Sequence, residues 1–277
     1  MLDETKNSFL AYLTAQNKAP ATIVAYGKDI EQLIVTLKRL GRTSFVETVK
    51  EDLETFLSEL KEKNFTPKTI SRKVNSIKTF YKFLQSEGKV KENPASDLTH
   101  PKYEMKDPRI LSKMEYRALR DVSRADIRTY AIIELFLQTG LRISEVADLT
   151  FENLTNGELT FTDRTIPLNQ AAQDALNQYL AIRPKKENSK HIFITKTGNP
   201  LLVRNIRTAV DRALKQAGID DAKVNDLRVT FIAHQLASGA PLEYISKLVG
   251  HKRISTTERY LNLVKEKPKK GAKLTEL

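Results

Sequence analysis

Four residues have types, an order and a spacing that suit the cleavage of a phosphodiester bond: Arg142, Arg228, His251 and Tyr260. Two guanidinium groups can hold the phosphate oxygens through paired hydrogen bonds. An imidazole can donate a hydrogen bond to the same group, and a phenol oxygen can attack phosphorus as a nucleophile. Together these groups would cut a phosphodiester through a covalent tyrosyl intermediate.

Each of the four residues also has an ordinary structural explanation. Arg142 could form an ion pair with Glu145, and Arg228 could point into solvent away from its helix. A single histidine is more often structural than catalytic, and a tyrosine in a terminal helix usually packs against the core. The combination and its order, rather than any one residue, therefore favour phosphate chemistry.

Composition favours a globular protein with a polyanionic partner. The 277 residues are 40% hydrophobic and 29% charged, which suits one large domain or two ordinary ones. Lys and Arg number 46 against 34 for Asp and Glu, a net charge of +12. Such a balance favours nucleic acid as the partner, although a basic surface can also serve solubility alone.

The residues that the chain lacks exclude several kinds of site. It has no cysteine, which excludes disulfides, thiolate zinc sites and cysteine nucleophiles. Its four histidines are not spaced as a metal pair, so we expect no metal and no cofactor. No apolar run approaches the roughly 20 residues that span a bilayer, and no signal peptide is recognised. We therefore expect a cytoplasmic protein without a membrane partner.

The N-terminal part is predicted to be helical. Apolar residues recur at helical spacing, and proline or threonine marks helix starts. A lysine-rich segment with Pro94, Pro101 and Pro108 then indicates a linker. The predicted domains are 1–92, a linker at 93–108 and 109–277. Helices in the first domain are predicted at residues 3–16, 20–40, 48–63 and 66–88.

The C-terminal part is predicted to be helical with a small β-sheet. Residues 129–139 are almost all apolar, which predicts a buried helix that ends at Gly140. A hairpin is expected at 158–168 around Asp163, and a short strand at 191–195. The predicted fold class is mainly α with a small sheet in this domain. Further helices are predicted at 169–182, 200–217, 226–238, 241–249 and 255–264.

Residue types at helix starts predict several caps. Ser112 and Glu115 form a capping box, as do Ser255 and Glu258 further along the chain. Asn225 is predicted to be an N-cap, which would place Arg228 at the third helical position. A cation there opposes the helix dipole unless an anion also binds at that end.

One helix of the first domain carries a face of like charge. Its basic residues span an arc of about 120° at 100° per residue, opposite an apolar face. A face with lysine and arginine and no acidic residue favours contact with phosphates, although an ordinary solvated face is the alternative. The predicted DNA-contacting residues are Lys68, Arg72, Lys78 and Lys82.

On these motifs the chain resembles the tyrosine recombinase (phage integrase) family and its compact Xer-type members. The resemblance covers nearly the whole length and rests on Thr-Gly-Leu-Arg-Ile-Ser-Glu-Val at 139–146, Leu-Arg at 227–228, Leu-Val-Gly-His at 248–251 and Thr-Thr-Glu-Arg-Tyr at 256–260. It implies an N-terminal SAM-like core-binding domain and a C-terminal catalytic domain that clamp DNA between them.

The resemblance also implies the reaction and the role of each residue. Arg142 and Arg228 would hold the scissile phosphate, His251 would bond to a phosphate oxygen, and Tyr260 would form a 3′-phosphotyrosyl link, with Glu145 as structural support. The implied partner is double-stranded DNA, bound by a dimer at each site and by a tetramer in synapsis. No metal, cofactor or ATP is implied.

Two positions depart from the family pattern. The family usually has histidine where this chain has Asn225, and asparagine cannot exchange a proton near neutral pH. The family's hairpin lysine is missing, and the only basic residue of this hairpin is Arg164. Arg164 matches the family's arginine before the second hairpin strand or replaces the lysine. The expectation is a site-specific recombinase; the alternative is a sequence-specific DNA-binding regulator, a phage-type repressor, with weak or lost cleavage.

Overall fold

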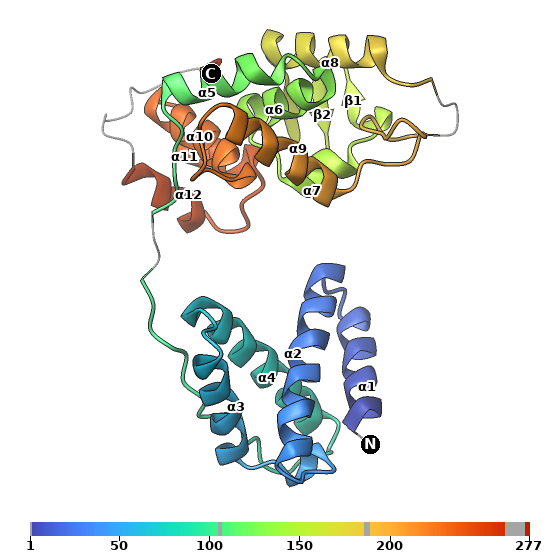
Figure 1. Cartoon of the computed structure of the whole chain (residues 1–277), viewed down its shortest axis with the longest axis vertical. Coiled ribbons are helices and arrows are strands. Elements are labelled where there is room, and N and C mark those ends of the chain that lie inside the picture. The colour runs from blue at the N-terminus through green and yellow to red at the C-terminus, as the bar shows by residue number, and fades with distance from the viewer. Residues whose placement is uncertain (1, 105–106, 186–188, 264–274) are drawn as a thin grey trace. The chain divides into compact units, whose positions relative to one another are not determined.

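The computed structural model describes residues 2–104, 107–185, 189–263 and 275–277. The chain forms two compact units, Met1–Met105 and Lys106–Leu277 (Figure 1). Residues 105–106 of the predicted linker, and residue 264 of the last predicted helix, lie outside the described part. None of the helices in the described part is long and apolar enough to cross a membrane.

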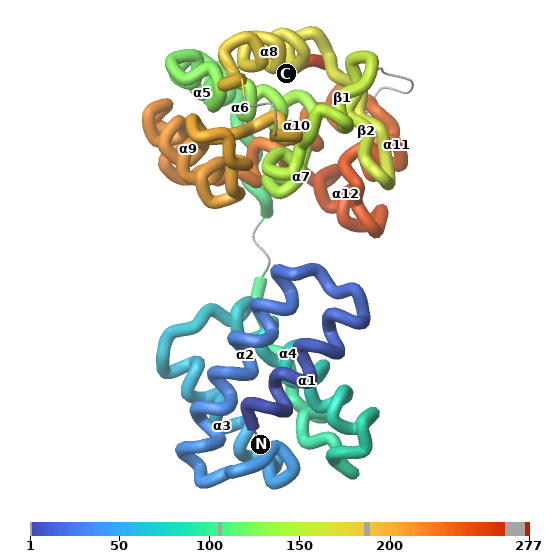
Figure 2. The backbone as a smooth tube through the Cα atoms, turned by 90° about the vertical axis from the view of Figure 1, so that its right-hand side faces the viewer, coloured from blue at the N-terminus to red at the C-terminus, as the bar shows by residue number. Residues whose placement is uncertain are grey.

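The N-terminal unit is a four-helix arrangement (Figure 2), and its hydrophobic core combines aliphatic and aromatic side chains. Pro20 and Pro67 occupy the first helical position, where the missing N–H costs nothing, and the Thr66 hydroxyl accepts from the backbone of Thr69. Phe9 and Phe80 meet edge to face with ring centroids 5.1 Å apart. The elements are α1 (Leu2–Ala15), α2 (Pro20–Arg39), the 3-10 turn η1 (Phe45–Glu47), α3 (Lys50–Glu62) and α4 (Pro67–Ser86).

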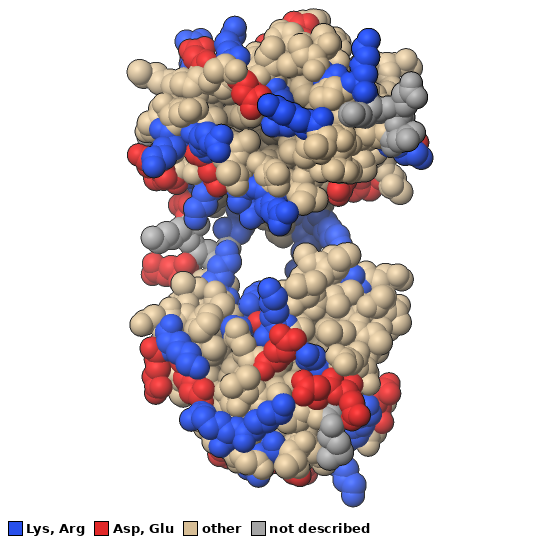
Figure 3. Space-filling view, turned by 45° about the vertical axis from the view of Figure 1, so that its right-hand side comes forward, with Lys and Arg blue, Asp and Glu red and all other residues tan. Residues whose placement is uncertain are grey.

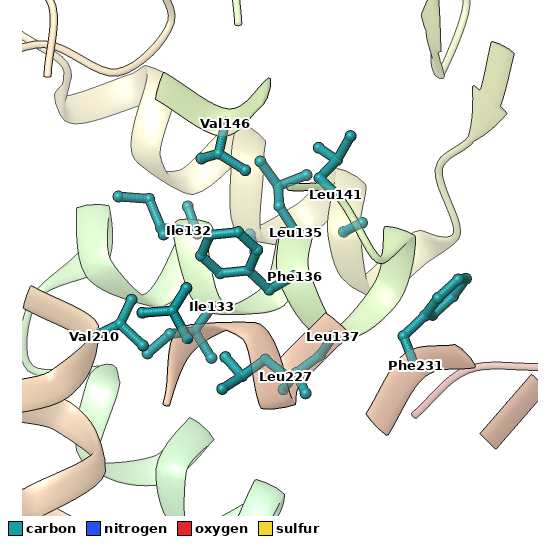
Figure 4. Close-up of a cluster of buried hydrophobic side chains, with 14 of the residues drawn as sticks. Ile132, Ile133, Leu135, Phe136, Leu137, Leu141, Val146, Val210, Leu227 and Phe231 are labelled. Carbon is teal, nitrogen blue, oxygen red and sulfur yellow. The ribbon is translucent and has the colours of Figure 1, made fainter. Parts of the chain in front are cut away.

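The C-terminal unit is built around α6 (Ile127–Thr139). Ten of the thirteen residues of this helix are buried, and it packs against α8 and α10. Figure 4 shows Phe136 of α6 among leucine and isoleucine side chains, with Leu227 of α10 and Val210 of α9 nearby. The other helices are α5 (Lys113–Ser123), α7 (Ile143–Asp148), η2 (Phe151–Asn153), α8 (Gln170–Ile182), α9 (Val203–Gln216), α10 (Val224–Ala237), α11 (Leu242–Leu248) and α12 (Ser255–Leu261).

A small antiparallel sheet lies beside these helices. Its strands are β1 (Leu154–Thr155), β2 (Glu158–Thr160) and β3 (Thr165–Pro167), in the order β1-β2-β3. Asn156 and Gly157 both have positive φ, which is the turn geometry that joins β1 to β2 tightly. Buried Leu159 pairs with Leu154 on one side and with buried Ile166 on the other. The prediction of a mainly helical fold with a small sheet is confirmed.

A strand and a capping box predicted in this unit are not formed. Residues 191–195 form no named strand; they make only isolated bridges, Thr150 to His191 and Ile194 to Pro200. The capping box of Ser255 and Glu258 is not formed, because α12 begins after Ile254, whose carbonyl accepts the first backbone bonds. By contrast, the Ser112 box is confirmed: the Ser112 backbone N–H donates to the Glu115 carboxylate at 2.8 Å.

Candidate functional site

The carboxyl end of α11 binds three arginines through three consecutive backbone carbonyls. The last carbonyls of a helix lack partners within the helix and carry the negative end of its dipole. Each guanidinium therefore finds an acceptor that no helical N–H can use. The donor and acceptor pairs are Arg164 Nε to Leu248 O at 2.8 Å, Arg228 Nη2 to Val249 O at 2.7 Å, and Arg142 Nη2 to Gly250 O.

Arg142 is held by hydrogen bonds to Glu145, and part of its guanidinium group is exposed. It is the N-cap of α7, and its backbone N–H donates to Glu145 Oε2 at 2.7 Å. Its guanidinium also donates to Glu145 Oε1 at 2.7 Å, so the expected ion pair is present. The side chain is still 40% exposed, which leaves part of the fork available to an external anion.

Arg228 is almost fully buried on α10, with 6% of its surface exposed. Its second acceptor is the carbonyl of Gly140, the left-handed residue that ends α6, so one guanidinium joins the ends of two helices. Burial and the neighbouring charge of Arg142 lower the pKa of Arg228 to about 10. The group is therefore still protonated at neutral pH and held rigidly.

The start of α10 differs from the sequence prediction. The helix begins at Val224, and the Asp226 carboxylate accepts from the backbone N–H of Lys223 at 2.8 Å. Asn225 is therefore not the N-cap, and Arg228 occupies the fifth helical position rather than the third. Asn225 lies exposed in the first turn. The Asp226 carboxylate, at the third position, stabilises the start of the helix, a role that the sequence predicted for Asn225.

Arg164 has the contacts of a supporting residue. It immediately precedes β3, its side chain is only 4% exposed, and it donates to Glu145 Oε1 at 2.7 Å and to Asp163 Oδ1 at 3.0 Å. Glu145 is thus shared by Arg142 and Arg164. Burial raises the pKa of Glu145, but the hydrogen bonds from the Arg142 backbone and from Arg164 outweigh this and lower it. The carboxylate stays ionised between two cations.

Gly250 provides the space in which two of these guanidinium groups lie. Its φ of +67° is the left-handed conformation of a helix-ending glycine, and His251 N–H bonds back to Ser246 O at 2.9 Å. A Cβ at this position would lie 2.8 Å from Nη1 of Arg164 and 3.2 Å from Nη1 of Arg142. A side chain here would displace the arginines.

His251 and Tyr260 lie against each other next to this cluster. Their rings stack with centroids 6.1 Å apart and an interplanar angle of 14°. Tyr260 belongs to α12, which packs on α10 and α11 (Figure 1). Nδ1 of His251 lies 2.7 Å from the hydroxyl of Thr257. Burial, together with the positive charges of Arg228 and Arg142, lowers the pKa of His251 to about 4, so the imidazole is neutral at pH 7.

A cavity of about 890 Å³ opens beside the two arginines. Apolar side chains such as Phe136 and Leu141 line it, together with charged side chains of α9 and of the α9–α10 connection. Asn225 lines it together with Arg142 and Arg228, whereas His251 and Tyr260 are not among its lining residues. The polar lining residues are Arg142, Ser144, Arg207, Asp211, Lys215, Asp220, Lys223, Asn225 and Arg228.

The four basic residues predicted on α4 lie in the other unit and differ in their freedom. Lys68 and Lys82 are exposed, and Lys68 lines a hollow of about 530 Å³ with Arg72. Arg72 donates to the buried carboxylate of Asp29 on α2, and Lys78 donates to a backbone carbonyl at 3.0 Å. Figure 3 shows basic side chains interspersed with acidic ones on the visible face of this unit.

Three residues of structural importance were missed by the sequence reading. Thr257 lies inside the stretch predicted to be a capping box, Gly250 was noted only within the motif at 248–251, and no role was predicted for Asp29. The sequence offers no signal for Asp29, since its partners are more than 40 residues away. Among the side chains of the described residues, no group of three or more His, Cys, Asp or Glu could hold a metal ion.

Comparison with known proteins adds family relationships. The model of the phage integrase family matches residues 108–267, and that of the phage integrase N-terminal SAM-like domain matches residues 7–88. Tyrosine recombinase XerC of Bacillus subtilis (strain 168) is 32% identical over 278 residues, which cover 93% of this chain and 91% of that protein.

Solved structures share the fold at lower identity. The Tn1549 transposon integrase in complex with circular intermediate DNA has a TM-score of 0.76 at 19% identity and covers 94% of both chains. A lambda integrase tetramer bound to a Holliday junction has a TM-score of 0.75 at 16% identity and covers 94% of this chain and 76% of that one.

Proposed function

The chain belongs to the phage integrase family, and from this premise we propose that it is a site-specific DNA recombinase. It would cut and rejoin duplex DNA through a 3′-phosphotyrosyl intermediate on Tyr260. The observation that carries the proposal is the cluster at the end of α11, where Arg142, Arg228 and His251 adjoin one another and Tyr260 stacks on the imidazole.

The contacts of each group suit one role in this reaction. The open part of the Arg142 fork and the buried Arg228 would bind the non-bridging oxygens and stabilise the charge that develops on them. Arg142 is already held by the Gly250 carbonyl and Glu145, and Arg228 by the carbonyls of Gly140 and Val249, so little reorganisation is needed when DNA binds. Neutral His251 would add a further hydrogen bond to a phosphate oxygen.

The reaction exchanges one phosphodiester bond for another and so keeps the bond energy. The Tyr260 oxygen forms a bond to phosphorus while the bond from phosphorus to the 5′ oxygen breaks. The phenol releases its proton to water, the leaving oxygen takes up a proton to become a 5′-hydroxyl, and the reverse reaction rejoins a strand. Since one phosphodiester replaces another, no nucleotide triphosphate is consumed.

Proton delivery to the leaving oxygen is where this chain departs from its family. Asn225 lies beside the arginines and can donate a hydrogen bond, but it cannot transfer a proton. The hairpin Glu158–Pro167 contains no lysine, and all three donor nitrogens of Arg164 are engaged. We propose that water supplies the proton, which makes cleavage slower by the roughly 10²–10⁴-fold that a positioned acid contributes.

DNA and further copies of the chain are the proposed partners. The basic helix α4 would contact phosphates through Lys68 and Lys82, with Arg72 and Lys78 partly engaged by their own unit. The N-terminal unit would act as the core-binding domain and the C-terminal unit as the catalytic domain, clamping the duplex. A dimer at each site and a tetramer in synapsis are the assemblies proposed, as in the lambda integrase tetramer on a Holliday junction.

A trapping assay tests the proposal. The binding site is first selected from a random duplex library, and the full chain is then incubated with a suicide duplex nicked next to the cleavage point. We expect a covalent complex that survives denaturant and is lost in Tyr260→Phe, while this variant still binds the site. Tight site-specific binding without an adduct in the wild-type chain would overturn the recombinase and leave the DNA-binding regulator.

A further inference from the structure

The hydroxyl of Thr257 is fully buried and has one hydrogen-bond partner in the described part of the chain. The side chain is 0% exposed, and its Oγ1 lies 2.7 Å from Nδ1 of His251. A helical threonine would otherwise donate to the carbonyl four residues earlier, here Arg253. That carbonyl instead accepts the backbone N–H of Thr256 at 3.1 Å.

The direction of this hydrogen bond follows from the inventory of donors and acceptors. A hydroxyl has one proton to donate, whereas a neutral imidazole has one donor and one acceptor nitrogen. If Nδ1 of His251 carried the proton, the Thr257 proton would be buried without an acceptor, which is the costly arrangement. The Thr257 hydroxyl therefore donates to Nδ1, and the imidazole proton resides on Nε2.

The electrostatic surroundings support the neutral imidazole that this assignment requires. Arg228 and Arg142 both lie close enough to lower the pKa of His251, in addition to burial. A doubly protonated ring would have to donate to Thr257 from Nδ1, reversing the hydrogen bond next to two cations. The neutral form with an Nε2 proton satisfies both the Thr257 hydroxyl and Nδ1 of His251.

We propose that Thr257 is a positioning residue that fixes His251 in the Nε2–H form, so that the imidazole offers the scissile phosphate a hydrogen-bond donor and not a base. The hydrogen bond from His251 to the scissile phosphate rests on the proposed function. The tautomer itself does not, because it is a property of the free protein. In this form, Nε2 cannot accept the proton of Tyr260, which must leave through another group or water.

Two variants of Thr257 separate the hydroxyl from the shape of the side chain. Thr257→Val keeps the volume and removes the donor, while Thr257→Ser keeps the donor and serves as the matched control. The tautomer is read in the full chain from ¹⁵N chemical shifts of the imidazole at pH 7, with His251→Gln identifying the signal. The cleavage rate on the suicide duplex is the second readout, and thermal unfolding checks that each variant is folded.

We expect the wild type and Thr257→Ser to show an unprotonated Nδ1 and a protonated Nε2. Thr257→Val should show a mixed population and a cleavage rate lower by about tenfold, the size of roughly one lost hydrogen bond. A wild-type Nδ1–H signal would overturn the proposal, as would a valine variant that keeps both the pure Nε2–H form and the wild-type rate.

The two proposals fail in distinguishable ways. If the wild-type chain forms no adduct but shows the Nε2–H form, the recombinase proposal fails and the assignment of Thr257 stands. If the adduct forms while Nδ1 carries the proton, the reverse holds. Should Thr257→Val be unfolded, the wild-type spectrum alone still decides the tautomer.

Discussion

Replacing Gly250 by alanine should damage both the stability of the C-terminal unit and its chemistry. The new Cβ would lie 2.8 Å from Nη1 and 3.0 Å from Cζ of Arg164, and 3.2 Å from Nη1 of Arg142. Arg164 cannot swing into solvent, because its side chain is 4% exposed and is bonded to Glu145 and to the Leu248 carbonyl. The guanidinium groups must therefore shift together.

The magnitude has two parts. The left-handed backbone costs a residue other than glycine about 1–2 kcal/mol. Inserting a methyl group into a filled site typically adds about 1–3 kcal/mol. We therefore expect Gly250→Ala to lower the free energy of unfolding by roughly 2–5 kcal/mol. Displacing the arginines that we propose hold the phosphate should slow cleavage by about 10²-fold.

Gly218 offers a matched control in the same unit. It follows α9 as Gly250 follows α11, with a φ of +73° and no atom within 4 Å of a Cβ built on it. Its backbone bonds are also equivalent, from Gly218 to Lys215 and from Ile219 to Leu214. Gly218→Ala therefore carries the backbone strain alone, about 1–2 kcal/mol, and should cleave like the wild type.

The two variants are compared by urea unfolding followed by circular dichroism, since the chain has no tryptophan to report by fluorescence. Cleavage is measured on the suicide duplex. Equal stabilities of Gly250→Ala and Gly218→Ala, with an unchanged cleavage rate in both, would refute the view that the glycine makes room for the arginines.

Two further predictions concern charge. Asp29→Ala leaves Lys73, which is 2% exposed and bonded to Asp29 at 2.8 Å, as a buried cation without its carboxylate. Urea unfolding should show a loss of about 3–5 kcal/mol in the N-terminal unit, and a loss below about 1 kcal/mol would contradict the buried pair. For His251, the folded pKa of about 4 lies below the ordinary 6.5. As pH falls from 6.5 to about 4, the imidazole takes up a proton in the unfolded chain but not in the folded chain, so His251 lowers the free energy of unfolding in this range. NMR titration should find the imidazole neutral at pH 5 in the free protein and its pKa raised when a DNA phosphate adjoins it; a free-protein pKa above 6 would contradict the burial described.

Much of the fold was accessible from the sequence because local patterns determine it. The buried helix α6 and its end at Gly140 were both predicted from residue type and spacing. The strand expected at 191–195 failed for a definite reason. Ile192 and Phe193 are fully buried, but their backbones bond to Leu149 and Leu201 in loops rather than to a strand. An apolar run indicates burial and does not by itself indicate pairing.

The residues of the candidate site were proposed from the sequence, but their contacts could not be. The order of the arginines, the histidine and the tyrosine follows from motifs, whereas the partners of Arg228 are carbonyls 88 and 21 residues away. Asn225 was predicted to be the N-cap from its side chain alone. In the structure, the Asp226 carboxylate instead accepts the backbone N–H of Lys223, the residue before the helix. The contact of Thr257 with His251 was likewise not predicted, because Thr257 lies in a stretch that resembles a capping box.

A structure of the Tyr260→Phe chain on its selected DNA site tests the central claim most directly. We expect one backbone phosphate to lie within hydrogen-bonding distance of Arg142, Arg228 and Nε2 of His251, with the ring at position 260 facing the same phosphorus. DNA that reaches only the basic residues of α9, with both arginines keeping only their present protein partners and His251 turned away from every phosphate, would contradict the account.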